Sequence, residues 1–166
     1  YREAAAVDPK AQANLIAGNG VANTLNGGGG TDTLFAGAGN DTVQMTAAAT
    51  LTDANFLHAS SVETLRLTGA STITLGVNAA SAGIANVVTG NAATSITSSN
   101  GVTLNVNAAA LANNIALTLV GSAARVVTGL IGNVTASSLT GALTVTTGDA
   151  TDNSIAITTG SAATSI

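Results

Sequence analysis

The chain has 166 residues but no cysteine, no tryptophan, one proline and one histidine. Because cysteine is absent, the protein has neither disulfide bonds nor thiolate metal sites. Only 7% of its residues are charged, against about 25% in ordinary domains, and only 2% are aromatic. Since large aromatic side chains are so few, we expect a thin structure of stacked layers and no thick, rounded core.

Basic residues are equally scarce. Four Lys and Arg side chains are spread along the chain, the net charge is −4 and the isoelectric point is near 4.4. Nucleic acids and anionic membranes are bound by clustered basic residues, so we predict neither partner. No apolar run approaches the ~18 residues of a membrane span, and we expect no membrane insertion. Residues 1–10 lack a signal-peptide core, and the sequence starts without Met and ends within a repeated motif, so we expect a segment of a longer protein.

Small and β-branched residues take the place of the missing types. The chain is 46% hydrophobic with a mean hydropathy of +0.45, which favours a folded chain over disorder. From about Leu65 onward, segments such as RLTGASTITLGV and SNGVTLNVN alternate apolar with small polar residues, the pattern of short strands. We expect helix only at residues 2–7 and 52–58, the second capped by Thr52 or Asp53.

A short motif recurs along this strand-rich region. It occurs at residues 90–96 (GNAATSI), 121–127 (GSAARVV) and 160–166 (GSAATSI), and a shorter relative starts at Gly69. The starting positions 69, 90, 121 and 160 differ by 21, 31 and 39, which are close to two, three and four times ten. These differences predict a half-coil of about ten residues and therefore a β-solenoid of stacked coils. A β-sandwich of short strands is the alternative fold.

Near the N-terminus the chain reads in blocks of nine. Residues 18–26 are GNGVANTLN, residues 27–35 are GGGGTDTLF and residues 36–44 are AGAGNDTVQ. The middle block fits the pattern GGxGxDxUx, with U a large aliphatic residue, at every fixed position. The third block departs only at Ala36, and the first has Asn23 in place of Asp. This nonapeptide run resembles the repeats-in-toxin (RTX, or hemolysin-type) family of calcium-binding β-rolls.

The chemistry of the run agrees with the resemblance. Glycine permits a sharp turn that aims carbonyl oxygens at one point, and an Asp carboxylate completes the all-oxygen shell that Ca²⁺ prefers. We therefore predict Ca²⁺ as a cofactor, and solvated turns without metal are the alternative. The predicted metal-site residues are Asp32, Asp41, Asn23, Gly18, Gly20, Gly28, Gly30, Gly37 and Gly39.

Two nonapeptides make one coil of such a roll, so alternate turns lie on the same edge. Turns 18–23 and 36–41 are expected to share one Ca²⁺ through Asn23 and Asp41. Turn 27–32 lies on the opposite edge, where we expect residues 45–50 (MTAAAT) to stack on it. Because that segment has neither Gly nor Asp, we expect Asp32 to have either a half-built site or an upstream partner at about residues 9–14 (PKAQAN), which also matches the pattern poorly. The prediction is one or two calcium ions.

These patterns divide the chain into four regions and predict an all-β fold, a β-roll or parallel β-helix. Residues 1–17 form a connector, residues 18–50 an RTX-type calcium-binding β-roll, and residues 51–64 a junction with a short helix. Residues 65–166 form a Thr/Val/Ala-rich β-solenoid that we expect to continue beyond the sequence.

The junction carries a second resemblance. The phrase VETLRLTG at residues 62–69, between the nonapeptide run and low-charge repeats, looks like the surface-layer and large adhesin-type RTX proteins of Gram-negative bacteria. This resemblance implies type I secretion and a calcium-dependent solenoid at the extracellular surface. We expect a structural segment of a surface-layer lattice or fibre, with copies of itself as partners and cell-surface polysaccharide as a further candidate. The alternatives are an adhesin segment that binds a surface ligand, and the β-roll tail of a type I-secreted enzyme.

Candidates for catalysis are few, and we predict that the chain is not an enzyme. His58 with a neighbouring serine and Asp53 would make a triad, but no GxSxG phrase accompanies it. Asp149 and Asp152 lie in a polar turn without an aromatic platform for a sugar. Ice binding by rows of threonine would need a Thr-x-Thr ladder at the coil spacing, and the sequence has no strict one.

Overall fold

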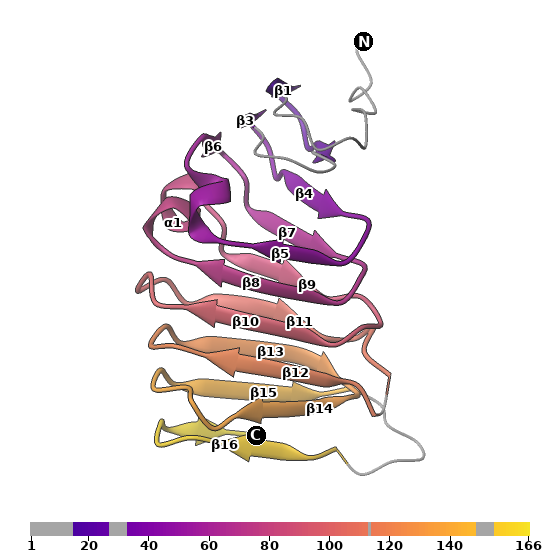
Figure 1. The fold of residues 1–166 in the computed structure, drawn as a ribbon, viewed down its shortest axis with the longest axis vertical. Helices are drawn as coiled ribbons and strands as arrows, with labels where there is room; N and C mark the ends of the chain where they lie inside the picture. The colour runs from indigo at the N-terminus through magenta and orange to yellow at the C-terminus, as the bar shows by residue number, and fades with distance from the viewer. Residues whose placement is uncertain (1–14, 27–32, 113, 149–154) are drawn as a thin grey trace.

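The protein is a parallel β-solenoid, described here from a computed structural model that covers residues 15–26, 33–112, 114–148 and 155–166 (Figure 1). Every pairing between the described strands is parallel, and each strand inside a sheet pairs with the strands one coil before and one coil after it. This arrangement confirms the predicted β-roll or parallel β-helix. A β-sandwich would have required antiparallel sheets.

Three sheets build the solenoid. The eight-stranded sheet runs along the described length and contains β2 (Thr24–Leu25), β4 (Thr42–Met45), β7 (Thr64–Leu67), β9 (Asn86–Val88), β11 (Leu104–Asn107), β13 (Arg125–Leu130), β15 (Leu143–Thr147) and β17 (Thr164–Ser165). The six-stranded sheet contains β5 (Ala49–Leu51), β8 (Ser71–Leu75), β10 (Thr94–Ser98), β12 (Ala116–Val120), β14 (Asn133–Ala136) and β16 (Ile157–Thr159). The three-stranded sheet contains β1 (Leu15–Asn19), β3 (Thr33–Gly37) and β6 (Ala59–Ser60).

The core consists of columns of aliphatic side chains, one residue from each coil. In the eight-stranded sheet the in-register column is Leu25, Val43, Leu65, Val87, Val106, Val127 and Val145, and no member is more than 4% exposed. Isoleucine and leucine at the inward positions of β8, β10 and β12 face the interior from the six-stranded sheet. Narrow layers of Val, Ile and Leu fill this space, so the fold manages with few aromatic residues.

The repeated glycine motif marks the turn that enters a strand, as its spacing predicted. Gly69 and Gly90 precede β8 and β10, which are neighbours in the six-stranded sheet. Gly121 and Gly160 precede β13 and β17, which are two strands apart in the eight-stranded sheet. When strands are counted along the chain, the motif recurs after two, three and four half-coils. This confirms the half-coil of about ten residues predicted from the motif spacing.

The coil changes shape after the nonapeptide run. Within the run one coil spans 18 residues, the separation of Asn23 and Asp41, and Thr24 pairs with Thr42 at the same interval. The next coil is longer: β4 is followed by β5, which starts the six-stranded sheet, and then by the 3₁₀-helix η1 (Asp53–Phe56) and by β6, which stacks on β3. The prediction that residues 45–50 stack on turn 27–32 falls on residues 27–32, which lie outside the described residues. The extra residues allow the chain to open a new sheet before it returns to β3.

A second helix, α1 (Val77–Ala82), was not predicted from the sequence. It follows β8, contacts η1 and β6, and buries Ala79 and Ala82 (Figure 1). It ends at Gly83, whose φ of 101° is left-handed. Six residues are too few for a clear helical period, which explains the missed helix.

The helix predicted at residues 52–58 is confirmed as η1. The Asn55 Oδ1 atom accepts hydrogen bonds from the Thr52 N–H at 2.8 Å and from the Thr52 hydroxyl at 3.0 Å. The helix predicted at residues 2–7 lies outside the described residues. In the described part of the chain, no helix is long and apolar enough to cross a membrane.

Candidate calcium site

Turns 18–23 and 36–41 lie on top of each other, one coil apart. Both lead into the eight-stranded sheet, and we call this side of the solenoid the entry edge. The Thr42 N–H donates to the Asn23 carbonyl at 2.9 Å, and the Ala38 N–H donates to the Asn19 carbonyl at 3.1 Å. Asn23 and Asp41 thus occupy equivalent places in successive coils, as their spacing predicted.

Glycine allows these turns to approach so closely. Gly37 and Gly39 have φ values of 103° and 123°, which residues other than glycine rarely adopt. A Cβ atom on Gly37 would collide with the Asn19 carbonyl, and one on Gly18 would collide with the Ala36 carbonyl oxygen and the Asn23 Oδ1 atom.

The predicted glycines are not equivalent. A Cβ atom on Gly20 would meet nothing within 4 Å, so close packing does not require glycine there. Gly28, Gly30 and Asp32 lie outside the described residues.

Oxygen atoms converge in the interior of the two stacked turns. The side chain of Asp41 is fully buried, and its Oδ1 atom accepts a hydrogen bond from the Asn23 N–H at 2.7 Å. Among the described residues, its Oδ2 atom has no hydrogen-bond partner. The Asn23 Oδ1 atom and the Ala36 carbonyl lie together beside Gly18. An unpaired carboxylate oxygen in the interior is costly, so the place is suited to a cation.

The donor set fits calcium in particular. Among the described residues, no three His, Asp or Glu side chains gather into a metal-binding cluster. A cation between turns 18–23 and 36–41 would depend on the Asp41 carboxylate with amide and main-chain oxygens, a combination typical of Ca²⁺. Its candidate donors are Asp41 Oδ2, the Ala36 carbonyl and Asn23 Oδ1, which in this structure accepts the Asn19 N–H at 2.7 Å.

Comparison with protein families agrees with this geometry. A family model described as the RTX calcium-binding nonapeptide repeat (4 copies) matches residues 11–43. These residues are RTX calcium-binding repeats. We call them the RTX run, and repeats of this kind typically bind Ca²⁺. No curated protein and no solved structure matches the chain.

Glu63 is a residue of the entry edge that the sequence analysis did not assign to the site. It precedes β7 in the coil after the RTX run, and its Oε2 atom accepts the Asp41 N–H at 2.7 Å. The main chain stacks here as it does between the two earlier turns, since the Thr64 N–H donates to the Asp41 carbonyl at 3.0 Å, as the Thr42 N–H does to the Asn23 carbonyl. Glu63 lies 22 residues after Asp41, so the nine-residue period of the RTX run does not reveal it.

Arg125 occupies the same column of the eight-stranded sheet further along the solenoid. Its side chain is 1% exposed, and its two terminal nitrogens donate to four main-chain carbonyls, those of Ser98, Val120, Ala123 and Ala124. Burial lowers the pKa of Arg125 to about 10. In this later coil, a guanidinium therefore donates hydrogen bonds to the main-chain carbonyls around the start of β13.

The residues considered for catalysis do not come together in the described structure. The side chain of His58 is exposed. The carboxylate of Asp53, the residue that would orient it, instead accepts the N–H groups of Gly76, Asn78 and Ala79 at 2.7–3.0 Å, at the start of α1. Asp149 and Asp152 lie outside the described residues.

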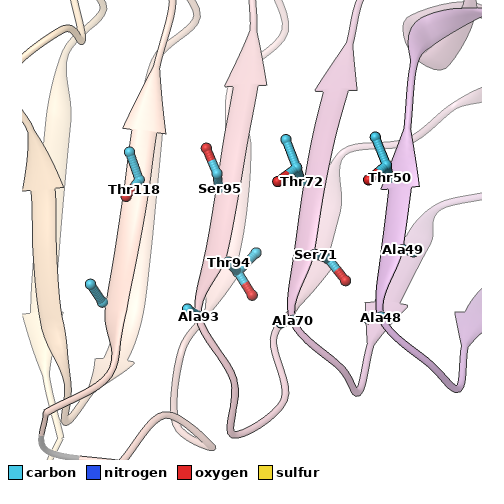
Figure 2. Close-up of a pocket in the computed structure, with 11 residues that line it drawn as sticks. Ala48, Ala49, Thr50, Ala70, Ser71, Thr72, Ala93, Thr94, Ser95 and Thr118 are labelled. Atoms are coloured by element: carbon cyan, nitrogen blue, oxygen red, sulfur yellow. The ribbon is translucent and has the colours of Figure 1, made fainter.

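The outer face of the six-stranded sheet carries a column of hydroxyl side chains. Strand register places Thr50, Thr72, Ser95, Thr118, Thr135 and Thr158 side by side. Figure 2 shows four of them along a groove of about 360 Å³, above a row of alanines that includes Ala70 and Ala93. The sequence analysis missed this column, because coils of unequal length hide what the register aligns. A strict Thr-x-Thr ladder is not formed by these described strands, since Thr97 pairs with Val120.

Proposed function

We propose that this chain is a structural segment of a secreted bacterial cell-surface protein, a rod that calcium stabilises at its RTX end and that assembles into a surface-layer lattice or fibre. The observation that carries the calcium part is the buried, unpartnered Oδ2 atom of Asp41 between two stacked turns. Proteins with RTX repeats are generally secreted, which supports an extracellular location.

Calcium would act on stability by binding the folded turns alone. The oxygens come from two turns that are 18 residues apart in sequence, so the unfolded chain does not present them together. At a free concentration of 100 times its dissociation constant, such an ion stabilises the fold by about 2.7 kcal/mol. The calcium ion would pair with the Asp41 carboxylate and would hold turns 18–23 and 36–41 together.

The assembly part of the proposal is supported by the surface of the sheets. Within the described strands the charged residues are Arg66, which is exposed, and Arg125, which is buried. Straight, uncharged faces of Thr, Ser, Asn and Ala repel neighbouring copies little, and stacked parallel strands repeat the same face along the rod. Such faces suit lateral packing of many identical copies.

Replacement of Asp41 tests the calcium part. We expect Asp41→Asn to lower calcium affinity at least tenfold, because a neutral amide replaces the one carboxylate at the stacked turns. Titration calorimetry of the wild type and the variant measures this. Asp53→Asn is the matched control, since its carboxylate caps α1, and its affinity should stay at the wild-type value.

Electron microscopy of the same samples tests assembly. The proposal predicts ordered sheets or fibres of the wild type on addition of calcium and dispersed particles of Asp41→Asn. Equal calcium affinities of the two proteins would contradict the site, and a strictly monomeric wild type at saturating calcium would contradict the scaffold.

An adhesin segment is the second candidate, and the groove on the six-stranded sheet favours it. A column of hydroxyl groups beside small alanines offers hydrogen bonds and a flat apolar surface to an uncharged polymer such as a cell-surface polysaccharide. Two results together would favour this candidate over the scaffold. The wild type would be a monomer that immobilised polysaccharide retains, and the double variant Thr72→Val, Thr118→Val would not be retained. The β-roll tail of a secreted enzyme is less well supported, because the solenoid continues far beyond the RTX run to β17.

A further inference from the structure

We propose that Glu63, a residue outside the RTX run, positions Asp41 for calcium and so links the ion to the first coil of the Thr/Val-rich solenoid. This inference rests on the proposed calcium function. Glu63 would not touch the ion but would act through the main chain of Asp41.

Two hydrogen bonds of the same kind connect three successive coils at the entry edge. The Asn23 N–H donates to Asp41 Oδ1 at 2.7 Å, and the Asp41 N–H donates to Glu63 Oε2 at 2.7 Å. In each step a carboxylate from the later coil accepts the N–H of the equivalent residue in the earlier coil. Glu63 therefore continues the column of Asn23 and Asp41 by one coil.

The burial of these groups makes the link specific. Asp41 is fully buried and Glu63 is half-buried, so the hydrogen bond between them is shielded from competing water. The Asp41 main chain is held on both sides, since its carbonyl accepts the Thr64 N–H at 3.0 Å. With its N–H and carbonyl fixed by residues 63 and 64, the Asp41 side chain has a defined direction toward the turn of Asn23.

The charges of the column explain why calcium and Glu63 should depend on each other. Asp41 and Glu63 bring two carboxylates into neighbouring coils, and within the described residues no ion pair neutralises them: Arg66 is exposed, and Arg125 donates to carbonyls in later coils. Without a cation their repulsion opposes the stacking of the two coils. A divalent cation beside Asp41 offsets that repulsion, and Glu63 then accepts the Asp41 N–H at a lower electrostatic cost.

Glutamate has the length that this coil needs. The coil between Asp41 and Glu63 has 22 residues, against 18 between Asn23 and Asp41, and the turn before Glu63 contains Ser61 with a φ of 56°. The turn itself is short, because Glu63 lies three residues after Ser60, whereas Asp41 lies six residues after Phe35, the partner of Ser60 in β3. From this shorter turn, a side chain with one more methylene than aspartate reaches the Asp41 N–H. Glu63→Asp should therefore behave as a loss of the contact, whereas Glu63→Gln keeps an oxygen at the same reach.

Calorimetric calcium titrations and thermal melts of the wild type, Glu63→Ala, Glu63→Gln and Glu63→Asp test the proposal, each in calcium and in excess EGTA. Replacing residues that hold a metal ligand in place typically lowers metal affinity about 10- to 100-fold. We expect a loss of about tenfold for Glu63→Ala and Glu63→Asp and a smaller loss for Glu63→Gln. Arg66→Gln, an exposed change on β7, the strand that follows Glu63, is the control and should leave affinity unchanged.

The melts separate positioning from a merely structural role. For a positioning residue, Glu63→Ala lowers the melting temperature more in calcium than in EGTA. Equal losses in both conditions, with unchanged calcium affinity, would overturn the role of Glu63 and leave the calcium site intact. A wild type that shows no response to calcium would overturn the proposed function and this inference together, and wild-type calcium affinity of Glu63→Asp would overturn the argument from reach.

Discussion

Arg125 shows how a single buried side chain can donate hydrogen bonds to several main-chain carbonyls where successive coils turn into the sheet. The guanidinium donates to four carbonyls at 2.6–3.3 Å, those of Ala123 and Ala124 in the turn before β13 and those of Ser98 and Val120 at the ends of β10 and β12. In the RTX run the equivalent corner presents Asp41 and a predicted calcium ion. The same column would thus hold a bound cation at one end, and it carries the side-chain cation of Arg125 further on.

The buried position of Arg125 leads to a stability prediction. Arg125→Met keeps much of the apolar stem but removes the guanidinium donor from four carbonyls, of which those of Ser98 and Ala124 keep main-chain donors, the N–H groups of Ala123 and Leu104. We therefore expect a loss of at least about 2 kcal/mol in the free energy of unfolding. Arg125→Lys should recover part of it, because an ammonium has three donors. Urea denaturation in calcium and in EGTA measures both variants, and the loss should be the same in the two conditions. A loss below about 0.5 kcal/mol, the size typical of a surface substitution, would contradict the role of Arg125.

Among the elements, α1 depends on a residue from an earlier coil. Burial by itself raises the pKa of Asp53, but the N–H groups of Ala79, Asn78 and Gly76 outweigh it, and the pKa lies below its ordinary value of 3.8. α1 has no side-chain cap of its own, since Gly76 stands at its N-cap. Asp53 therefore caps α1 from η1 and holds the two short helices together at the junction.

This cap should be visible in the pH dependence of stability. Because the folded-state pKa of Asp53 is depressed, its contribution is complete above the unfolded pKa of about 3.9 and is lost as pH falls through the folded value. We expect Asp53→Ala to cost about 1 kcal/mol at pH 7, as capping residues do. Chemical denaturation at pH 7 and near pH 2 compares the two proteins. A gap that does not narrow in acid would show that the Asp53 charge is not responsible.

The elements also explain what could be predicted from sequence and what could not. Within the RTX run the turns follow one another at a constant interval of one nonapeptide, so the stacking of Asn23 and Asp41 follows by counting. Beyond it the coils differ in length, since Ala116 pairs with Asn133 whereas Ser71 pairs with Thr94, and counting no longer yields the register. Glu63 and the hydroxyl column depend on that register and were missed. The alternation of apolar residues did predict the strands, because alternation does not depend on coil length.

At the scale of the whole molecule, the eight-stranded sheet joins two regions that are stabilised differently. The strands β2 and β4 are short, and the turns before them bury the unpaired Asp41 Oδ2 atom, which we propose calcium binds. From β7 onward, continuous columns of buried Leu, Val and Ile hold the coils together, and each such side chain contributes about 1.5–3 kcal/mol of burial. Calcium should therefore organise the N-terminal coils, while the Thr/Val-rich coils keep their structure without it.

Hydrogen exchange followed by mass spectrometry, with calcium and with excess EGTA, tests this division most directly. The account predicts that amides of β1 to β4 lose protection when calcium is removed, because their turns open locally, and that amides of β9 to β15 stay protected. Identical protection along the chain in both conditions would contradict a calcium-organised RTX end. Loss of protection from β1 through β15 together would contradict the independent stability of the later coils.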